Sequence, residues 1–152
     1  MGAIANGEAT KKTSSSPEDV WHMISDGSRV AAWWPRAERA EDVQGGVFTL
    51  VLRSNRGVAV RTDWSVERSQ KYRLQRWEQQ LANTPFAKAL LQSAVEVRIE
   101  PTGDGGSQIT VAVERELKQK GMFAGRLGRK ASVEQARLSL GGLTELLEAL
   151  PD

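Results

Sequence analysis

The chain has 152 residues, of which 39% are hydrophobic and 26% are charged, and its formal net charge is +2. This length suits a single domain over residues 1–152 with a buried core, and so small a charge gives no reason to expect a nucleic-acid partner. The absence of cysteine excludes disulfides and thiolate catalysis, and no apolar run approaches the roughly 18 residues of a membrane span, so we expect no integral membrane association. No secretory signal opens the chain, which favours a cytoplasmic location.

Residues 14–35, SSSPEDVWHMISDGSRVAAWWP, carry the signals of two short helices. Ser16 can cap a helix that begins at Pro17, and acidic residues in the first turn suit its positive end. The second helix must end near Trp34, because Pro35 disfavours helical geometry in the residue before it. A weakly apolar first strand, AIANGEATKKTS, is expected ahead of both helices.

Residues 37–118 show the alternation of apolar and polar side chains that is typical of strands. In VAVRTDWSVE, Thr62 and Trp64 fall on one face, which we expect to point inward. The strands QSAVEVRIE and QITVAVERE flank PTGDGGS, a glycine-rich hairpin connection. Between the earlier and later strands, ANTPFAKAL predicts a short helix or lid that Thr84 caps.

The strand KYRLQRWEQQ allows two arrangements. If Tyr72 and Leu74 face the core, the alternation also turns Arg76 inward, where it could anchor a carboxylate, phosphate or enolate of a ligand. With the Tyr72 hydroxyl and Glu78, Arg76 could then promote enolisation. A bulge would instead point Trp77 inward and Arg76 outward, and the sequence does not choose between the two arrangements.

Residues 122–150 predict one long amphipathic helix. Its apolar stripe recurs at spacings of three and four and comprises Val133, Ala136, Leu140, Leu143, Leu147 and Leu150. Gly141 and Gly142 interrupt the helix at a cost of roughly 1 kcal/mol each relative to alanine. Close packing on the sheet, a slight bend, or room for a bound molecule would offset that cost.

This order of elements predicts an α+β fold: a curved antiparallel sheet of six to seven strands around a long C-terminal helix, with two short helices after the first strand. The chain also resembles the START-like, birch-pollen-allergen-like (SRPBCC) superfamily with the helix-grip fold, in its polyketide cyclase/dehydrase and lipid-transport branch. The resemblance covers residues 9–150 and is carried by SSPEDVWHMISDGSRVAAWWP, YRLQRW, PTGDGGSQITV and the terminal helix. It implies a hydrophobic or amphipathic ligand such as a lipid, polyketide, sterol or aromatic compound, but no particular reaction.

A sheet that wraps one helix, with short helices closing one end, tends to leave a cavity. We expect Trp33 and Trp34 at its mouth, although both could equally fill the core. The candidate cavity residues are Trp33, Trp34, Thr62, Trp64, Tyr72, Arg76, Phe86, Phe123, Leu127, Ala136 and Leu140. A binding protein for a hydrophobic small molecule is the first hypothesis, and a cyclase, aromatase or dehydratase that uses the same cavity is the second.

The sequence predicts no cofactor and no metal site, since its single histidine, His22, is expected on an exposed helix face. A third hypothesis concerns residues 118–130, which hold five cations and no acidic residue: Lys118, Lys120, Arg126, Arg129 and Lys130. Such a segment could contact phosphate, anionic lipid or an acidic partner, or it could be a solvated helix start.

Overall fold

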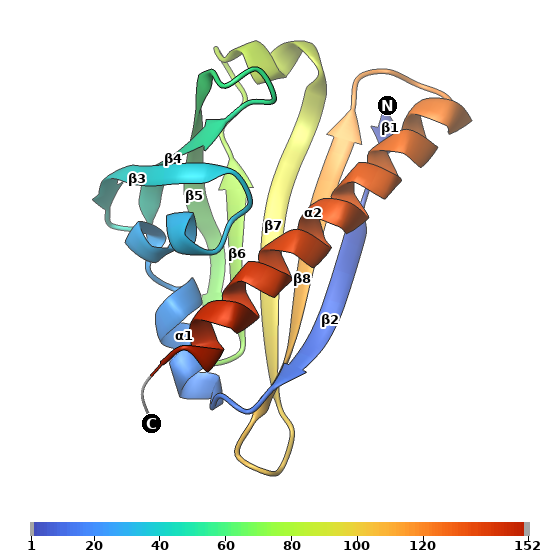
Figure 1. Cartoon of the computed structure of the whole chain (residues 1–152). Coiled ribbons are helices and arrows are strands. Elements are labelled where there is room, and N and C mark those ends of the chain that lie inside the picture. Colours follow the sequence, from blue (N-terminus) through green and yellow to red (C-terminus); the bar gives the residue numbers. More distant parts are fainter. Residues whose placement is uncertain (1, 151–152) are drawn as a thin grey trace.

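The computed structural model describes residues 2–150, in which an eight-stranded antiparallel sheet wraps the long helix α2, Met122–Glu148 (Figure 1). The sheet order is β1-β8-β7-β6-β5-β4-β3, and β2 also pairs with β8, so β1 and β2 form one interrupted edge strand. The strands are β1 Ala3–Ile4, β2 Gly7–Thr13, β3 Ala37–Gln44, β4 Val47–Arg53, β5 Ala59–Gln70, β6 Leu74–Gln79, β7 Leu90–Pro101 and β8 Ser107–Leu117. The helix-grip fold expected from the sequence is therefore confirmed, and the interruption of the first strand explains the extra strand. Between residues 2 and 150, no helix has the length and apolar character that crossing a bilayer requires.

The short helices begin where the sequence predicts them. Helix α1, Pro17–Ile24, is capped by Ser16, whose hydroxyl accepts a hydrogen bond from the Asp19 N–H at 3.1 Å. The 3₁₀ helix η1, Gly27–Ala32, follows α1 and leads into β3, whereas η2, Pro85–Lys88, connects β6 and β7 and is capped by Thr84. His22 is exposed on α1, as expected.

The register of β6 decides between the two arrangements that the sequence left open. A bulge in β5 lies between Val66 and Arg68, and beyond it Val66 pairs with Trp77 while Arg68 pairs with Arg76. Trp77 points into the core and is 2% exposed, whereas Arg76 lies on the outer face of the sheet. Trp77 therefore points inward and Arg76 outward, and the arrangement with Arg76 inward is wrong. The bulge expected in this strand is not needed, because β6 pairs with β7 in a regular register and Tyr72 lies in the preceding turn with a φ of 68°.

Helix α2 buries most of the predicted stripe, including Ala136, Leu140, Leu143 and Leu147. Val133 is exposed although it lies against the edge strand, where a Cβ on Gly7 would come within 2.4 Å of the Val133 backbone nitrogen. The Ser132 hydroxyl donates to the Ala5 carbonyl at 2.7 Å, which ties this part of the helix to the edge strand. Leu150 is also exposed, since it lies beyond the helix end at Glu148.

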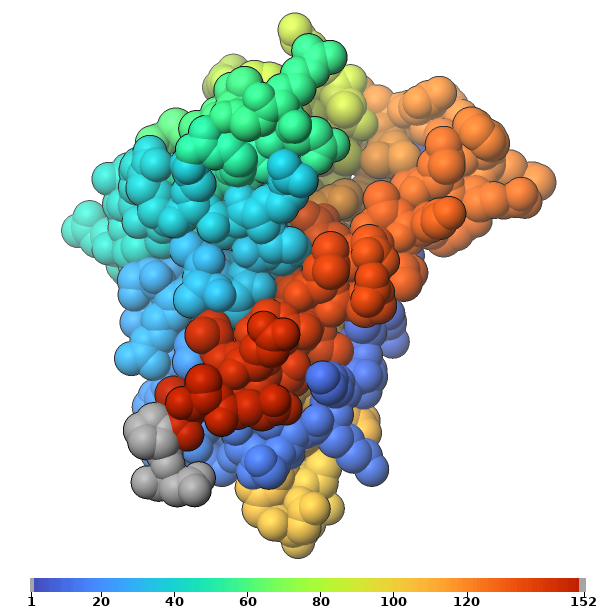
Figure 2. All heavy atoms as spheres, in the orientation of Figure 1, coloured from blue at the N-terminus to red at the C-terminus, as the bar shows by residue number. Residues whose placement is uncertain are grey.

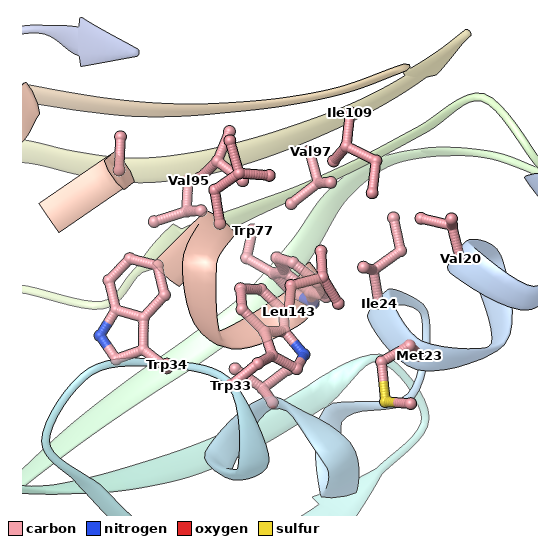
Figure 3. Packing of buried hydrophobic residues seen from close by; sticks show 14 of the residues in the cluster. Val20, Met23, Ile24, Trp33, Trp34, Trp77, Val95, Val97, Ile109 and Leu143 are labelled. Carbon is pink, nitrogen blue, oxygen red and sulfur yellow. The ribbon is translucent and has the colours of Figure 1, made fainter. Parts of the chain in front are cut away.

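The half of the interior next to α1 is solidly packed (Figure 3). Trp33 lies edge-on to Trp34, with ring centroids 6.1 Å apart, and it lies 6.4 Å from Trp77. The void among these rings and their neighbours is only about 10 Å³, about enough for one water. These tryptophans therefore fill the core and separate it from the rest of the interior.

Helix α2 touches the tryptophan cluster with its backbone at Gly142. A Cβ atom at this position would lie 2.6 Å from the Trp33 carbonyl oxygen, a distance at which the chain would have to shift. At Gly141 a Cβ would meet nothing within 4 Å. Close packing therefore accounts for Gly142 but not for Gly141.

We predict opposite effects of the same substitution at these adjacent glycines. Gly142→Ala should lower the free energy of unfolding by about 1–3 kcal/mol, because it forces α2 away from Trp33. Gly141→Ala should raise it by roughly 0.5–1 kcal/mol, because alanine favours a helix interior. Urea denaturation of both variants measures the difference, and equal effects would show that the Trp33 contact does not hold α2 in place.

Candidate functional site

A cavity of about 330 Å³ lies at the end of the sheet remote from α1, beside the first half of α2. Figure 2 shows the surface notched there, between the orange first half of α2 and the green β4–β5 connection. The volume falls at the lower end of the range of about 300–1,000 Å³ for small-molecule sites. The lining residues are Ala5, Trp34, Leu52, Thr62, Trp64, Gln79, Phe86, Ala89, Leu90, Arg115, Leu117, Gly128, Ala131 and Gln135.

The cavity exists because α2 presents small side chains to it. Gly128 and Ala131 face the sheet where bulky residues would otherwise fill the interior. Gly128 is also tightly constrained, since a Cβ there would lie 2.6 Å from the Cβ of Ala5. The helix can therefore rest on the edge strand while leaving space toward β5 and β6.

The two adjacent tryptophans have different roles. Trp34 lines both the cavity and the small void of the core, so it forms the wall between them. Trp33 lines only the small void and is 2% exposed. Both indoles are buried, Trp34 at 5% exposure, so neither stands at an open mouth. The alternative that they fill the core fits Trp33, which packs against Trp34 and Trp77, whereas Trp34 also faces the cavity.

Thr62 and Trp64 form a wall whose polar atoms are already satisfied. The indole Nε1 of Trp64 donates to the Thr62 hydroxyl at 2.8 Å, and that hydroxyl donates to the Leu50 carbonyl at 2.7 Å. With these bonds made, the pair offers mainly apolar surface to the cavity.

Arg115 enters the cavity from β8 and was not foreseen from the sequence. The alternation that buries Ile109, Val111 and Val113 places Arg115 on the same inward face, so the signal was present in QITVAVERE. Its Nη2 donates to the Gln135 side-chain oxygen. Burial lowers the pKa of Arg115 because the charged guanidinium is partly removed from water.

Gln79 adds a second polar group to the lining. Its side chain is 8% exposed, and its Nε2 has no hydrogen-bond partner among the described residues. A buried amide donor without an acceptor is costly, which marks Gln79 as an incompletely satisfied group of the cavity.

Arg76 lies in an ion-pair network on the outer face of the sheet, so its predicted place in the cavity is a correction. Its Nε lies 2.8 Å from Glu67, and its Nη1 lies 2.5 Å from Glu114 and 3.6 Å from Glu96. These carboxylates raise the pKa of Arg76, with the hydrogen bond to Glu114 as the largest cause.

The other predicted cavity residues divide into two groups. Phe86 lines the cavity together with Trp34, Thr62 and Trp64, as expected. The remaining candidates lie elsewhere: Tyr72 in the β5–β6 turn with a φ of 68° and its ring against Trp21, Ala136 and Leu140 in the solid core, and Phe123 and Leu127 exposed on α2. Tyr72 misses the cavity because β6 begins only at Leu74.

Among residues 2–150, those that line the cavity include no aspartate, glutamate, histidine, lysine or tyrosine. Arg115 is therefore its one charged side chain, and its other polar side-chain groups are two amides, one hydroxyl and two indole N–H groups. Within residues 2–150, no three His, Cys, Asp or Glu side chains gather closely enough to hold a metal ion. The site suits binding and charge stabilisation better than proton transfer.

The sequence matches the family described as polyketide cyclase/dehydrase and lipid transport over residues 6–148. No curated protein matches it. Among solved structures, a START superfamily protein from Mycobacterium smegmatis is 16% identical, with a TM-score of 0.76 over 96% of this chain and 99% of that one. The Zhui aromatase/cyclase from Streptomyces sp. R1128 is 17% identical, with a TM-score of 0.73 over 95% and 94%. Ara h 8.0201 is 13% identical, with a TM-score of 0.71 over 97% and 100%. At these identities the structures show a shared fold.

We predict that Arg76→Met weakens the fold without changing the cavity. Loss of its charge-assisted hydrogen bonds should lower the free energy of unfolding by about 1–3 kcal/mol, since Glu96 is buried beside it. Arg61→Met is the control, because Arg61 is an outer-face arginine whose side chain is 55% exposed, and it should change stability little. Urea denaturation compares the two variants, and an equal loss for both would contradict a structural role for the Arg76 network.

Proposed function

The chain belongs to the polyketide cyclase/dehydrase and lipid transport family, and from this membership we propose that it binds a hydrophobic or amphipathic small molecule in the cavity beside the first half of α2. The observation that carries the proposal is the cavity itself, with aromatic walls from Trp34, Trp64 and Phe86. Such walls supply large apolar contact area to a ligand.

The size of the cavity limits the ligand. At about 330 Å³ the cavity is small among sites for small molecules, which suits a compact apolar group. A single medium-length acyl chain or two fused aromatic rings meets this limit.

A cyclase or aromatase activity is a second candidate, favoured by the likeness to the Zhui aromatase/cyclase. In such a reaction Arg115, rather than Arg76, would stabilise an enolate, because Arg115 is the cation in the cavity. The described lining supplies no side chain that exchanges protons near neutral pH. A lining without such a side chain favours ligand binding over catalysis.

The start of α2 supports an additional role in docking to an anionic lipid surface. Met122 and Phe123 are 78% and 74% exposed on the end of the helix that projects from the molecule (Figure 2). The basic tip, which we define as residues 118–130, surrounds them with five cations and no acidic residue. Cations at a helix N-terminus oppose the helix dipole, and no side chain caps this end. At an anionic bilayer the exposed apolar side chains would be buried among the lipids, and the cations would be attracted to the lipid head groups.

The cavity proposal is tested with two neutral probes, 2-acetylnaphthalene and 1-dodecanol. Each should bind at a one-to-one ratio in isothermal titration calorimetry. Ala131→Trp should reduce both affinities at least about tenfold, because the added indole occupies cavity volume. Leu138→Trp is the matched control, since Leu138 is exposed on α2 away from the cavity, and it should leave both affinities unchanged. Failure of both probes to bind the unmodified protein would contradict the proposal.

The docking role is tested by co-sedimentation with vesicles of phosphatidylserine and phosphatidylcholine, compared with phosphatidylcholine alone. The protein should sediment with the anionic vesicles and be released by added salt. Phe123→Asp should reduce the bound fraction several-fold, because it places a charge in the apolar contact and repels the lipid. Leu138→Asp adds the same charge farther along α2 and should have little effect. Equal losses in the two variants, or equal binding to both vesicles, would contradict docking through the basic tip.

A further inference from the structure

We infer that the ligand of this cavity carries a carboxylate, which Arg115 binds at the inner side of the edge strand. This inference rests on the proposed binding function and adds to it the chemical class of the ligand. It follows from the position of Arg115, from its lack of an acidic partner, and from the polar groups beside it.

Arg115 is fixed at the interruption of the edge strand. Its backbone N–H donates to the Asn6 side-chain oxygen at 3.1 Å, and its carbonyl accepts from the Ala5 N–H at 2.8 Å. Asn6 lies between β1 and β2, so the break in the edge strand holds the backbone of Arg115 on β8. The side chain is thereby directed from a rigid strand into the cavity, which favours a defined binding geometry.

The other interior and sheet arginines have acidic partners, and Arg115 has none. On the outer face, Arg68, Arg76 and Arg98 each pair with Glu96. Among residues 2–150, no carboxylate lies within 4.0 Å of the Arg115 guanidinium, whose hydrogen-bonding side-chain partner is the neutral Gln135. A partly buried cation without a counter-ion is unfavourable, and an anion that enters the cavity relieves that cost.

Gln135 orients Arg115 without neutralising it. Its side-chain oxygen engages Nη2, and no hydrogen bond from the described residues engages Nε or Nη1. A guanidinium with free N–H groups matches the two oxygens of a carboxylate, and such charge-assisted bonds are among the strongest in proteins. Gln79 belongs to the same lining, and its buried Nε2 has no acceptor among residues 2–150.

The charge of the lining favours a carboxylate over a phosphate monoester. Arg115 is the one charged residue among those of the described chain that line the cavity, so it can neutralise a single negative charge. A second charge on a phosphate would stay unpaired in a mostly apolar space, which is costly. The remaining lining, with Trp34, Trp64 and Phe86, accommodates the apolar body of the same molecule.

The test compares 2-naphthoate with 2-acetylnaphthalene, which have nearly the same shape and differ in charge. The unmodified protein should bind 2-naphthoate at least about tenfold more tightly in isothermal titration calorimetry. Arg115→Met should abolish this preference by weakening 2-naphthoate, while the affinity for 2-acetylnaphthalene stays within about twofold. Gln135→Glu should abolish it as well, because it supplies Arg115 with an internal counter-ion and retains a side chain of the same size.

Arg68→Met is the matched control, since it removes an arginine from the outer face and should keep the preference for 2-naphthoate. Equal affinities for the two probes in the unmodified protein, or an unchanged preference in folded Arg115→Met and Gln135→Glu, would overturn the inference and leave the binding function standing. Failure of both probes to bind the unmodified protein would overturn both. A preference for naphthyl phosphate over 2-naphthoate would overturn the assignment of a carboxylate.

Discussion

The contact between α2 and Trp33 determines how the interior of this protein is divided. At Gly142 the helix backbone lies directly against the Trp33 carbonyl, and Trp33 in turn packs between Trp34 and Trp77. A 27-residue helix is stiff, so anchoring its second half on this cluster also sets the path of its first half. The first half rests on the edge strand through Gly128 and Ser132 and leaves the space toward β5 and β6 unfilled. A solid core and a ligand-sized cavity thus occur under one helix.

Arginines on the two faces of the sheet have different partners. Outward arginines surround Glu96, which is buried although it lies on the outer face, because their long side chains cover it. The inward Arg115 meets an amide and an apolar space instead. Since the side chains of a strand alternate between faces, the register of each strand decides whether its arginine stabilises the fold or is available to a ligand.

The proposed ligand site and the proposed lipid contact belong to the same end of the molecule. The basic tip contains Gly128 and is followed directly by Ala131, and both residues line the cavity. An amphipathic carboxylate at a bilayer surface would therefore be near both features, with its apolar body facing the tryptophans and its charge facing Arg115. The solid packing around Trp33 and Ile24 closes the opposite end, so exchange of a ligand is directed toward the tip.

The sequence by itself determined the order of the elements, their caps and the amphipathic character of α2, because turns, caps and side-chain periodicity are local properties of the chain. Thr62, Trp64 and Phe86, which it proposed as cavity residues, line the cavity of the structure. The facing of Arg76 depended on the pairing of β6 with β7, in which Trp77 lies opposite Val95 and Arg76 opposite Glu96, and the roles of the two tryptophans depended on where the helix backbone approaches them. The exposure of Phe123 likewise depended on how far α2 projects beyond the sheet. Only the tertiary structure decided these points, since each results from contacts between segments that are distant in the sequence.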